Sequence, residues 1–264
     1  MTPVVLNGLA EGQRQSWLGL LEVARVHPDG WCLVGGQMVY LICRERSFAP
    51  VRLTNDSDLA LDVRAHPNVL HDFTAALVSV GFVPAGESPE GHQHRWVRDL
   101  ASIDLLIPQD VGGAAASRRG VGGGTTLQAP GAQQAITRSE PVTVQVGGTV
   151  GTVRRPNMLG ALVAKAAAYS VWNDAAPQRH LSDFAVLAAM AGRADRLAEQ
   201  MSARDRRYLA AALLALSQSR PLWAGIEGAD RAVEALRGLI ASPAAGAASP
   251  KGAGASAKRP PIDP

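Results

Sequence analysis

The sequence predicts an α+β fold, with a mixed sheet and flanking helices in the N-terminal part and a helical bundle after it. Two observations lead to this prediction. Up to Pro108, short apolar runs alternate with segments whose apolar side chains recur at helical spacing, whereas from Asn157 onward only the helical spacing is found. The chain has 264 residues, which is enough to bury a substantial core.

We expect three segments along the chain. Residues 1–155 are predicted to form the α/β domain, and residues 156–242 the helical domain. Residues 243–264 contain too few large apolar side chains to fold, so we expect a disordered tail.

The elements before residue 110 follow in order from the spacing of apolar side chains. Trp17, Leu20 and Leu21 share one helical face, and Trp31 to Val34 is a short apolar run, so a helix and then a strand are predicted. Gly35-Gly36 reads as a turn. The elements expected next are a helix over 37–44, a strand over 51–63, a helix over 67–80, and two strands within 92–108 with a turn near Arg98-Asp99.

The remaining elements are predicted by a change of composition. Residues 111–134 are rich in Gly and Ala, and we expect them to be mobile. Two strand-like runs, 140–146 and 151–156, follow and are joined through Gly147-Gly148. Helices are expected at 157–172, 180–192, 203–217 and 227–240.

Composition excludes several classes of protein. Hydrophobic residues make up 47% of the chain and charged residues 19%, with a formal net charge of +3 and no dense basic stripe. These values permit a nucleotide or nucleic-acid partner without requiring one. Two cysteines do not form a disulfide framework, and the start of the chain does not resemble a signal peptide. The cysteine usage makes a reducing cytoplasm the expected location, and no apolar run is long enough to span a membrane, so we expect no membrane partner.

Acidic residues mark the strand predicted over 51–63. In an extended chain, Asp56, Asp58 and Asp62 point to one face, opposite Leu59 and its apolar neighbours. Carboxylates gathered on one face repel one another, and a divalent cation such as Mg²⁺ would stabilise them. Asp104, within the apolar run "SIDLLIP", offers a third carboxylate from a neighbouring strand. Such a set suits metal-assisted phosphoryl or nucleotidyl transfer, and a glycine turn entering a helix is a ready anion site.

Three stretches together resemble a known family. "LVGGQMVYL", the run "RLTNDSD" from Arg52 to Asp58, and "SIDLL" are similar to the minimal nucleotidyltransferases of the polymerase-beta-like superfamily, and most similar to the AbiEii and MenT toxins. Lys165 in "ALVAKAAAYS" and Asp183 in "RHLSDFAVL" extend the resemblance, which covers roughly residues 30 to 190.

The resemblance implies an activity and a set of residue roles. The implied reaction moves an NMP from an NTP, with Mg²⁺, to an acceptor hydroxyl, which in this family can be the 3′ end of a tRNA. The protein would then be a toxin with an antitoxin partner. The implied metal ligands are Asp56, Asp58 and Asp104. The implied nucleotide contacts are Gly35, Gly36, Arg52, Thr54 and, at the phosphates, Lys165, with Asp183 supporting the helical side.

Alternatives remain open at this point. The enzyme could instead modify a small molecule such as an aminoglycoside, or the fold could bind a nucleotide or protein without catalysis. Each residue also has a plainer interpretation. "TNDSD" suits a turn, Lys165 could extend along the bundle surface, and Asp183 could pair with Arg179.

Overall fold

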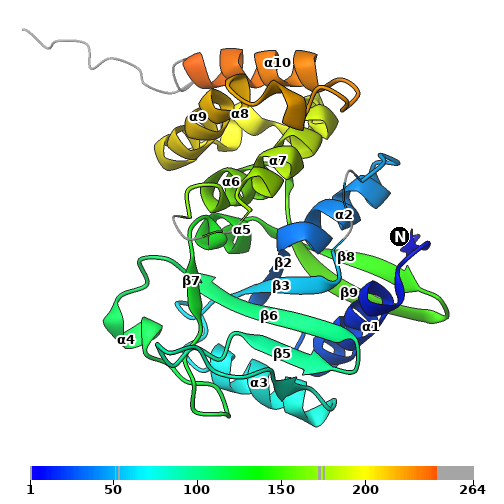
Figure 1. The fold of residues 1–264 in the computed structure, drawn as a ribbon, viewed down its shortest axis with the longest axis vertical. Coiled ribbons are helices and arrows are strands. Elements are labelled where there is room, and N and C mark those ends of the chain that lie inside the picture. Colours follow the sequence, from blue (N-terminus) through cyan, green and yellow to red (C-terminus); the bar gives the residue numbers. More distant parts are fainter. Residues whose placement is uncertain (1, 51, 53, 172–173, 175, 243–264) are drawn as a thin grey trace, which may run out of the picture.

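The computed structural model describes residues 2–50, 52, 54–171, 174 and 176–242. The fold is α+β, as predicted, with two sheets at one end of the molecule and a stack of helices at the other (Figure 1). The tail expected over 243–264 lies outside the described residues.

The larger sheet has six strands and holds most of the predicted N-terminal strands. Its order is β2-β3-β6-β5-β4, and β7 pairs with the end of β6. The β3–β6 and β6–β7 pairs are parallel, and the other pairs are antiparallel. The strand bounds are β2 Trp31–Val34, β3 Asp56–Leu61, β4 Val83–Pro84, β5 Arg95–Arg98, β6 Ala101–Pro108 and β7 Leu127–Ala129.

A second sheet of three strands has the order β1-β8-β9. The predicted hairpin through Gly147-Gly148 is confirmed as β8 (Ser139–Val146) and β9 (Thr149–Pro156). The short β1 (Val4–Leu6), which the sequence did not predict, pairs in parallel with β8. Helix α1 (Glu11–Val26) packs against both β6 and β9, and its Trp17 and Leu20 are fully buried.

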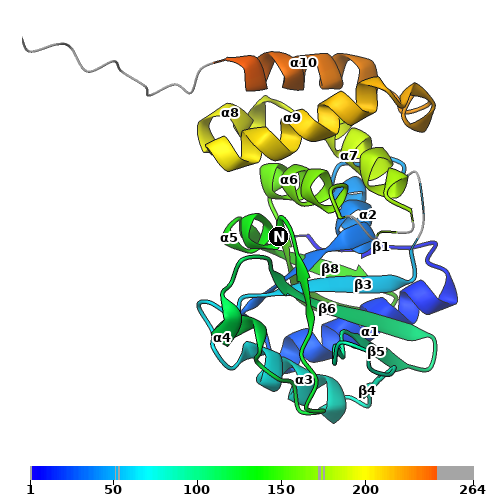
Figure 2. The ribbon, with the colours of Figure 1, turned by 60° about the vertical axis from the view of Figure 1, so that its left-hand side comes forward.

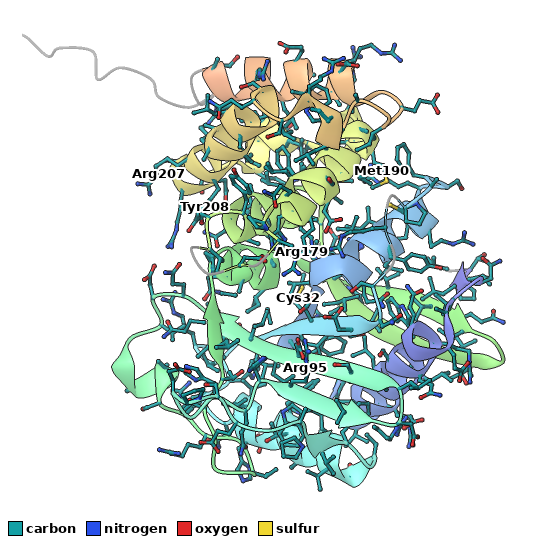
Figure 3. The ribbon with its side chains drawn as sticks, viewed as in Figure 1. Cys32, Arg95, Arg179, Met190, Arg207 and Tyr208 are labelled. Atoms are coloured by element: carbon teal, nitrogen blue, oxygen red, sulfur yellow. The ribbon has the colours of Figure 1, made fainter. Side chains whose placement is uncertain are left out.

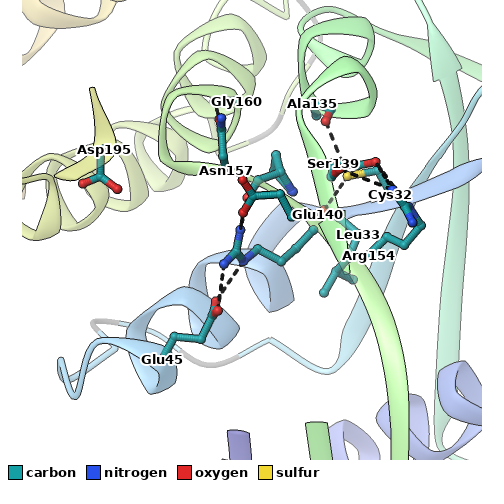
Figure 4. Close-up of polar contacts among 12 residues, drawn as sticks. Cys32, Leu33, Glu45, Ala135, Ser139, Glu140, Arg154, Asn157, Gly160 and Asp195 are labelled. Carbon is teal, nitrogen blue, oxygen red and sulfur yellow. Dashed lines mark hydrogen bonds and ion pairs between the residues drawn. The ribbon is translucent and has the colours of Figure 1, made fainter. Parts of the chain in front are cut away.

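Helix α2 (Gly35–Glu45) starts directly at the end of β2, so the predicted Gly35-Gly36 turn is wrong: both glycines lie in the first turn of the helix. This helix lies between the larger sheet and the helical part, in contact with β3 and with α7 (Gln178–Met190). Arg155 of β9 joins it to the second sheet through ion pairs of 2.7 Å with Glu45 and Glu140 (Figure 4). Helix α3 (Val69–Ser79) occupies the far end of the molecule (Figure 1).

The Gly- and Ala-rich segment expected to be mobile is built into the fold instead. It contains α4 (Gly113–Ala116), β7 and α5 (Ala132–Thr137). Backbone and hydroxyl groups hold it: Gln93 N–H donates to the Thr125 carbonyl at 2.8 Å, and the Thr126 hydroxyl donates to the Leu105 carbonyl at 2.5 Å. Main-chain hydrogen bonds hold this segment in place, although it has few of the large apolar side chains that usually anchor a segment in the core.

The four large predicted helices are present in the C-terminal part, and they stack on α2 and α5 (Figure 2). Besides α7 they are α6 Met158–Ala168, α9 Ala203–Ser217 and α10 Ala229–Ala241, with the short α8 Leu197–Gln200 and two 3-10 turns, Arg193–Asp195 and Arg220–Leu222. One hydrophobic core runs from Leu6 to Leu236, through both parts of the molecule. Within the residues that the structure describes, no helix combines the length and the apolar character needed to cross a bilayer.

Candidate active site

Strand register places the acidic residues side by side. Asp58 of β3 is directly opposite Asp104 of β6, and Asp104 is directly opposite Arg95 of β5. Residues paired in this way share one face of a sheet, and Asp56 joins them because it lies two residues before Asp58. The predicted meeting of the two acidic strands is therefore confirmed.

The three carboxylates form a compact donor set. One carboxylate oxygen from each of Asp56, Asp58 and Asp104 can be chosen so that all three lie within 4.8 Å of one another. Asp62 does not join them, because β3 ends at Leu61 and an Asp62 oxygen accepts a hydrogen bond from the Ala65 amide at 3.1 Å. Asp62 belongs to a turn, although its spacing placed it on the same face.

The cluster is electrostatically crowded. Burial, and after it the charges of the nearby Asp56 and Asp104 carboxylates, raise the pKa of Asp58 to about 7. The charges of Lys165 and Arg179 offset only part of this increase. A cation bound at the cluster would relieve the repulsion that raises the pKa.

Arg95 is a site residue that the sequence analysis did not identify. Its Nε and Nη2 atoms donate to the two oxygens of Asp104 at 2.8 and 2.6 Å, and Nη2 lies 3.8 Å from Asp56 Oδ2. Hydrogen bonding to Asp104 raises the pKa of the guanidinium. A tight hairpin turn at Asp99-Leu100 places Arg95 opposite Asp104, so an exact turn prediction would have found it. Figure 3 labels Arg95 on the sheet and Arg179 on the helical side.

Gly35 and Gly36 leave room for the site side chains. A Cβ atom on Gly35 would lie 1.7 Å from Asp58 Oδ2, and Gly35 has a φ of +66°. A Cβ on Gly36 would lie 2.6 Å from Thr54 Cγ2. The pair is thus required for packing at the start of α2, whether or not it also contacts a phosphate.

The segment before β3 is fastened to both sides of the site. Arg52 donates to the Asp183 carboxylate at 2.6 and 2.9 Å, and the Thr54 hydroxyl donates to Asp56. The fully buried Gln37 donates to the Thr54 carbonyl at 2.7 Å and accepts from Trp17 Nε1 at 2.8 Å. The sequence analysis missed Gln37, because an amide inside a predicted helix resembles an exposed position.

Lys165 is buried and paired, which excludes the surface interpretation. Its ammonium lies 2.8 Å from Asp183 Oδ2, and the side chains of Lys165 and Asp183 are 2% and 4% exposed. Burial alone would raise the pKa of Asp183, but Lys165 and Arg52 outweigh it and hold that pKa below its ordinary value. The structure thus brings Lys165 and Asp183 together with Arg52 at the junction of sheet and helices.

Asp183 does not pair with Arg179. Arg179 and His180 both contact Asp174 instead, at 3.1 and 2.6 Å. Burial and the charge of Lys165 together lower the pKa of His180 to about 4, against the opposing effect of Asp174. His180 is therefore neutral at pH 7 in the folded protein.

Comparisons with known proteins found a likeness at the level of structure. Neither a family model nor a curated protein matches the chain. Among solved structures, the chain is similar to an antigenic nucleotidyltransferase-like protein from Paracoccidioides brasiliensis, with a TM-score of 0.48 and 17% identity. The match covers 86% of this chain and 94% of that chain. At this identity and TM-score, the two proteins are not shown to share an activity.

Proposed function

We propose that this protein is a Mg²⁺-dependent nucleotidyltransferase that moves an NMP from an NTP to an acceptor hydroxyl. The observation that supports this function best is the register of β3 and β6, which gathers Asp56, Asp58 and Asp104 with oxygens within 4.8 Å of one another. Three hard oxygen donors on one sheet face, beside the start of a helix, fit a cation that carries phosphates.

The donor set fits Mg²⁺ by its chemistry. Magnesium prefers carboxylate and water oxygens, and it is usually held by a few carboxylates together with substrate phosphates. The open side of the cluster suits this, since the Asp56 side chain is 35% exposed. When bound, Mg²⁺ would neutralise phosphate charge and favour attack at the α-phosphorus.

Residues of the chain would bind the metal, bind the phosphates and supply positive charge. Asp56, Asp58 and Asp104 would hold the metal, and the amide groups of Gly35 and Gly36 at the start of α2 would bind phosphate oxygens. Lys165 and Arg52 would add positive charge on the helical side, with Asp183 fixing both side chains. In the overall reaction the acceptor oxygen bonds to the α-phosphorus, the bond to the β-phosphate breaks, and pyrophosphate and a proton are released.

The finer part of the proposal rests on the sequence resemblance to the AbiEii and MenT toxins. We propose a tRNA 3′ end as acceptor, a role as a growth-arresting toxin, and an antitoxin protein as partner. A small-molecule acceptor is the principal competing substrate.

The test incubates the purified protein with each labelled NTP, Mg²⁺ and total RNA, and with aminoglycosides in a parallel reaction. We expect label in the tRNA fraction, and none with Asp58→Asn. Asp62→Asn is the matched control, because it removes a neighbouring carboxylate outside the cluster. Equal transfer by wild type and a folded Asp58→Asn protein would refute the proposed site, and label on an aminoglycoside alone would refute the tRNA acceptor.

A further inference from the structure

Arg95 reaches the acidic cluster from its open side. The Arg95 side chain is 48% exposed, whereas that of its partner Asp104 is 9% exposed. A long side chain with half of its surface in solvent can leave its partner without disturbing the core. The guanidinium thus approaches a buried carboxylate from solvent.

The contacts of Arg95 coincide with those that a metal would need. Its two donors cover both oxygens of Asp104, and the same Nη2 atom faces Asp56 Oδ2 at 3.8 Å. A cation coordinated by Asp104 must use a carboxylate oxygen that now accepts a hydrogen bond from the Arg95 guanidinium. Arginine binds carboxylates in this two-point manner more tightly than a single hydrogen bond allows.

Other cations near the site are committed elsewhere. Lys165 and Arg52 both pair with Asp183, and Arg179 pairs with Asp174. Among the residues that the structure describes, Arg95 alone forms ion pairs with members of the cluster. Arg95 therefore supplies the direct ion-pair contacts of the cluster in the absence of a metal.

We propose that Arg95 is an internal competitor for the divalent cation, holding Asp104 and Asp56 in the metal-free protein and leaving them when the cation binds. This inference deepens the proposed function and rests on its metal site. The competition weakens binding of a free cation. It is relieved when the cation arrives with a triphosphate, because the phosphates give the released guanidinium an anionic partner.

The test measures Mn²⁺ binding without nucleotide, by electron paramagnetic resonance titration of the full chain. We expect Arg95→Gln to bind Mn²⁺ about tenfold more tightly than wild type, the scale of one lost charge-assisted contact. Arg95→Lys should fall between them, since it keeps the charge but loses the two-point contact. Arg98→Gln is the matched control: it removes the same charge from the same strand, but Arg98 pairs with Glu22.

Melting temperatures of the same variants check that they fold and give a second readout. In EDTA, Arg95→Gln should melt below wild type, because the carboxylates repel without a cation. Saturating Mn²⁺ should remove this difference, because the ion then replaces the guanidinium charge.

The outcomes separate this inference from the proposed function. If Arg95→Gln and Arg95→Lys bind Mn²⁺ no more tightly than wild type while Asp58→Asn loses binding, the metal site stands and the competitor role is overturned. If neither wild type nor Arg95→Gln binds Mn²⁺, or Asp58→Asn binds as well as both, the metal site is wrong and both proposals are overturned.

Discussion

At the scale of single residues, Gly35 shows how closely the site is packed. Gly35→Ala would place a methyl group 1.7 Å from Asp58 Oδ2. Gly8 is a matched control, since its φ of +68° is nearly the same and nothing lies within 4 Å of a Cβ built there. We expect Gly35→Ala to lose about 1–3 kcal/mol more unfolding free energy than Gly8→Ala, the usual cost of overpacking. Gly35→Ala should also weaken Mn²⁺ binding. If Gly35→Ala and Gly8→Ala lose the same unfolding free energy in urea, Asp58 moves away from the added methyl group without cost.

A second residue-scale prediction concerns the pair Lys165–Asp183. Lys165→Met leaves the buried Asp183 carboxylate with Arg52 as its remaining ion-pair partner, so this substitution should cost about 3 kcal/mol of unfolding free energy. Adding Asp183→Asn should cost less than the sum of the single losses, because the two side chains share one ion pair that either substitution alone removes. Arg220→Ala, which breaks an exposed pair with Asp230, should cost less than about 1 kcal/mol. A loss that small for Lys165→Met would show that the pair does not stabilise the fold.

The third residue-scale prediction is a pH dependence at His180. Its pKa is about 4 in the folded protein and 6.5 ordinarily, so below pH 6.5 the unfolded chain binds the extra proton. The stability from neutral His180 is complete above pH 6.5 and is lost as the pH falls toward 4. Between pH 7 and pH 5, wild type should lose about 2 kcal/mol more than His180→Gln in urea unfolding.

Burial is the largest cause of this shift; among the neighbouring groups, Lys165 and Arg179 lower the pKa further and Asp174 raises it. His71→Gln serves as the control, because the His71 side chain is 62% exposed. If His180→Gln and wild type lose the same stability on acidification, His180 is not kept neutral by the fold.

At the scale of elements, a single ion pair joins α5 to α9. Arg138, at the end of α5, contacts Asp205 at 2.6 Å, and the Asp205 side chain is 0% exposed. We expect Arg138→Met to cost about 3 kcal/mol by leaving that carboxylate short of a cation. Arg204→Ala should change stability little, since its pair with Asp110 is exposed. A similar effect of both substitutions, measured by thermal unfolding, would mean that α5 and α9 are held by packing alone.

Elements also show what the sequence can and cannot predict. The helices α6, α9 and α10 were predicted because their apolar periodicity is long, and β2 because its run of four residues is wholly apolar. The short β1 and β7 were missed because three-residue strands exist only through their partners. The acids of the site could be identified from residue type and spacing. Arg95 could not, because its place depends on the register of a hairpin.

At the scale of the whole molecule, the shared core predicts cooperative unfolding. We have proposed a division between residues 155 and 156, yet the core cluster includes side chains on both sides of it. Buried tryptophans report on both parts, Trp17 and Trp96 on one side and Trp223 on the other. We expect tryptophan fluorescence and far-ultraviolet circular dichroism to give coincident urea transitions. Two separated transitions would show that the parts are stable independently.

The row of paired residues across β2, β3, β6 and β5 links metal binding to the accuracy of folding. Val34, Asp58, Asp104 and Arg95 are neighbours in that row, although they come from strands far apart along the chain. A slip of β3 by one residue would turn Asp58 to the opposite face and bring Ser57 or Leu59 in its place. A slipped chain has no complete donor set, so by mass action a divalent cation favours the correctly paired chain alone. The cation would then select correctly paired strands over slipped ones, before any nucleotide is bound.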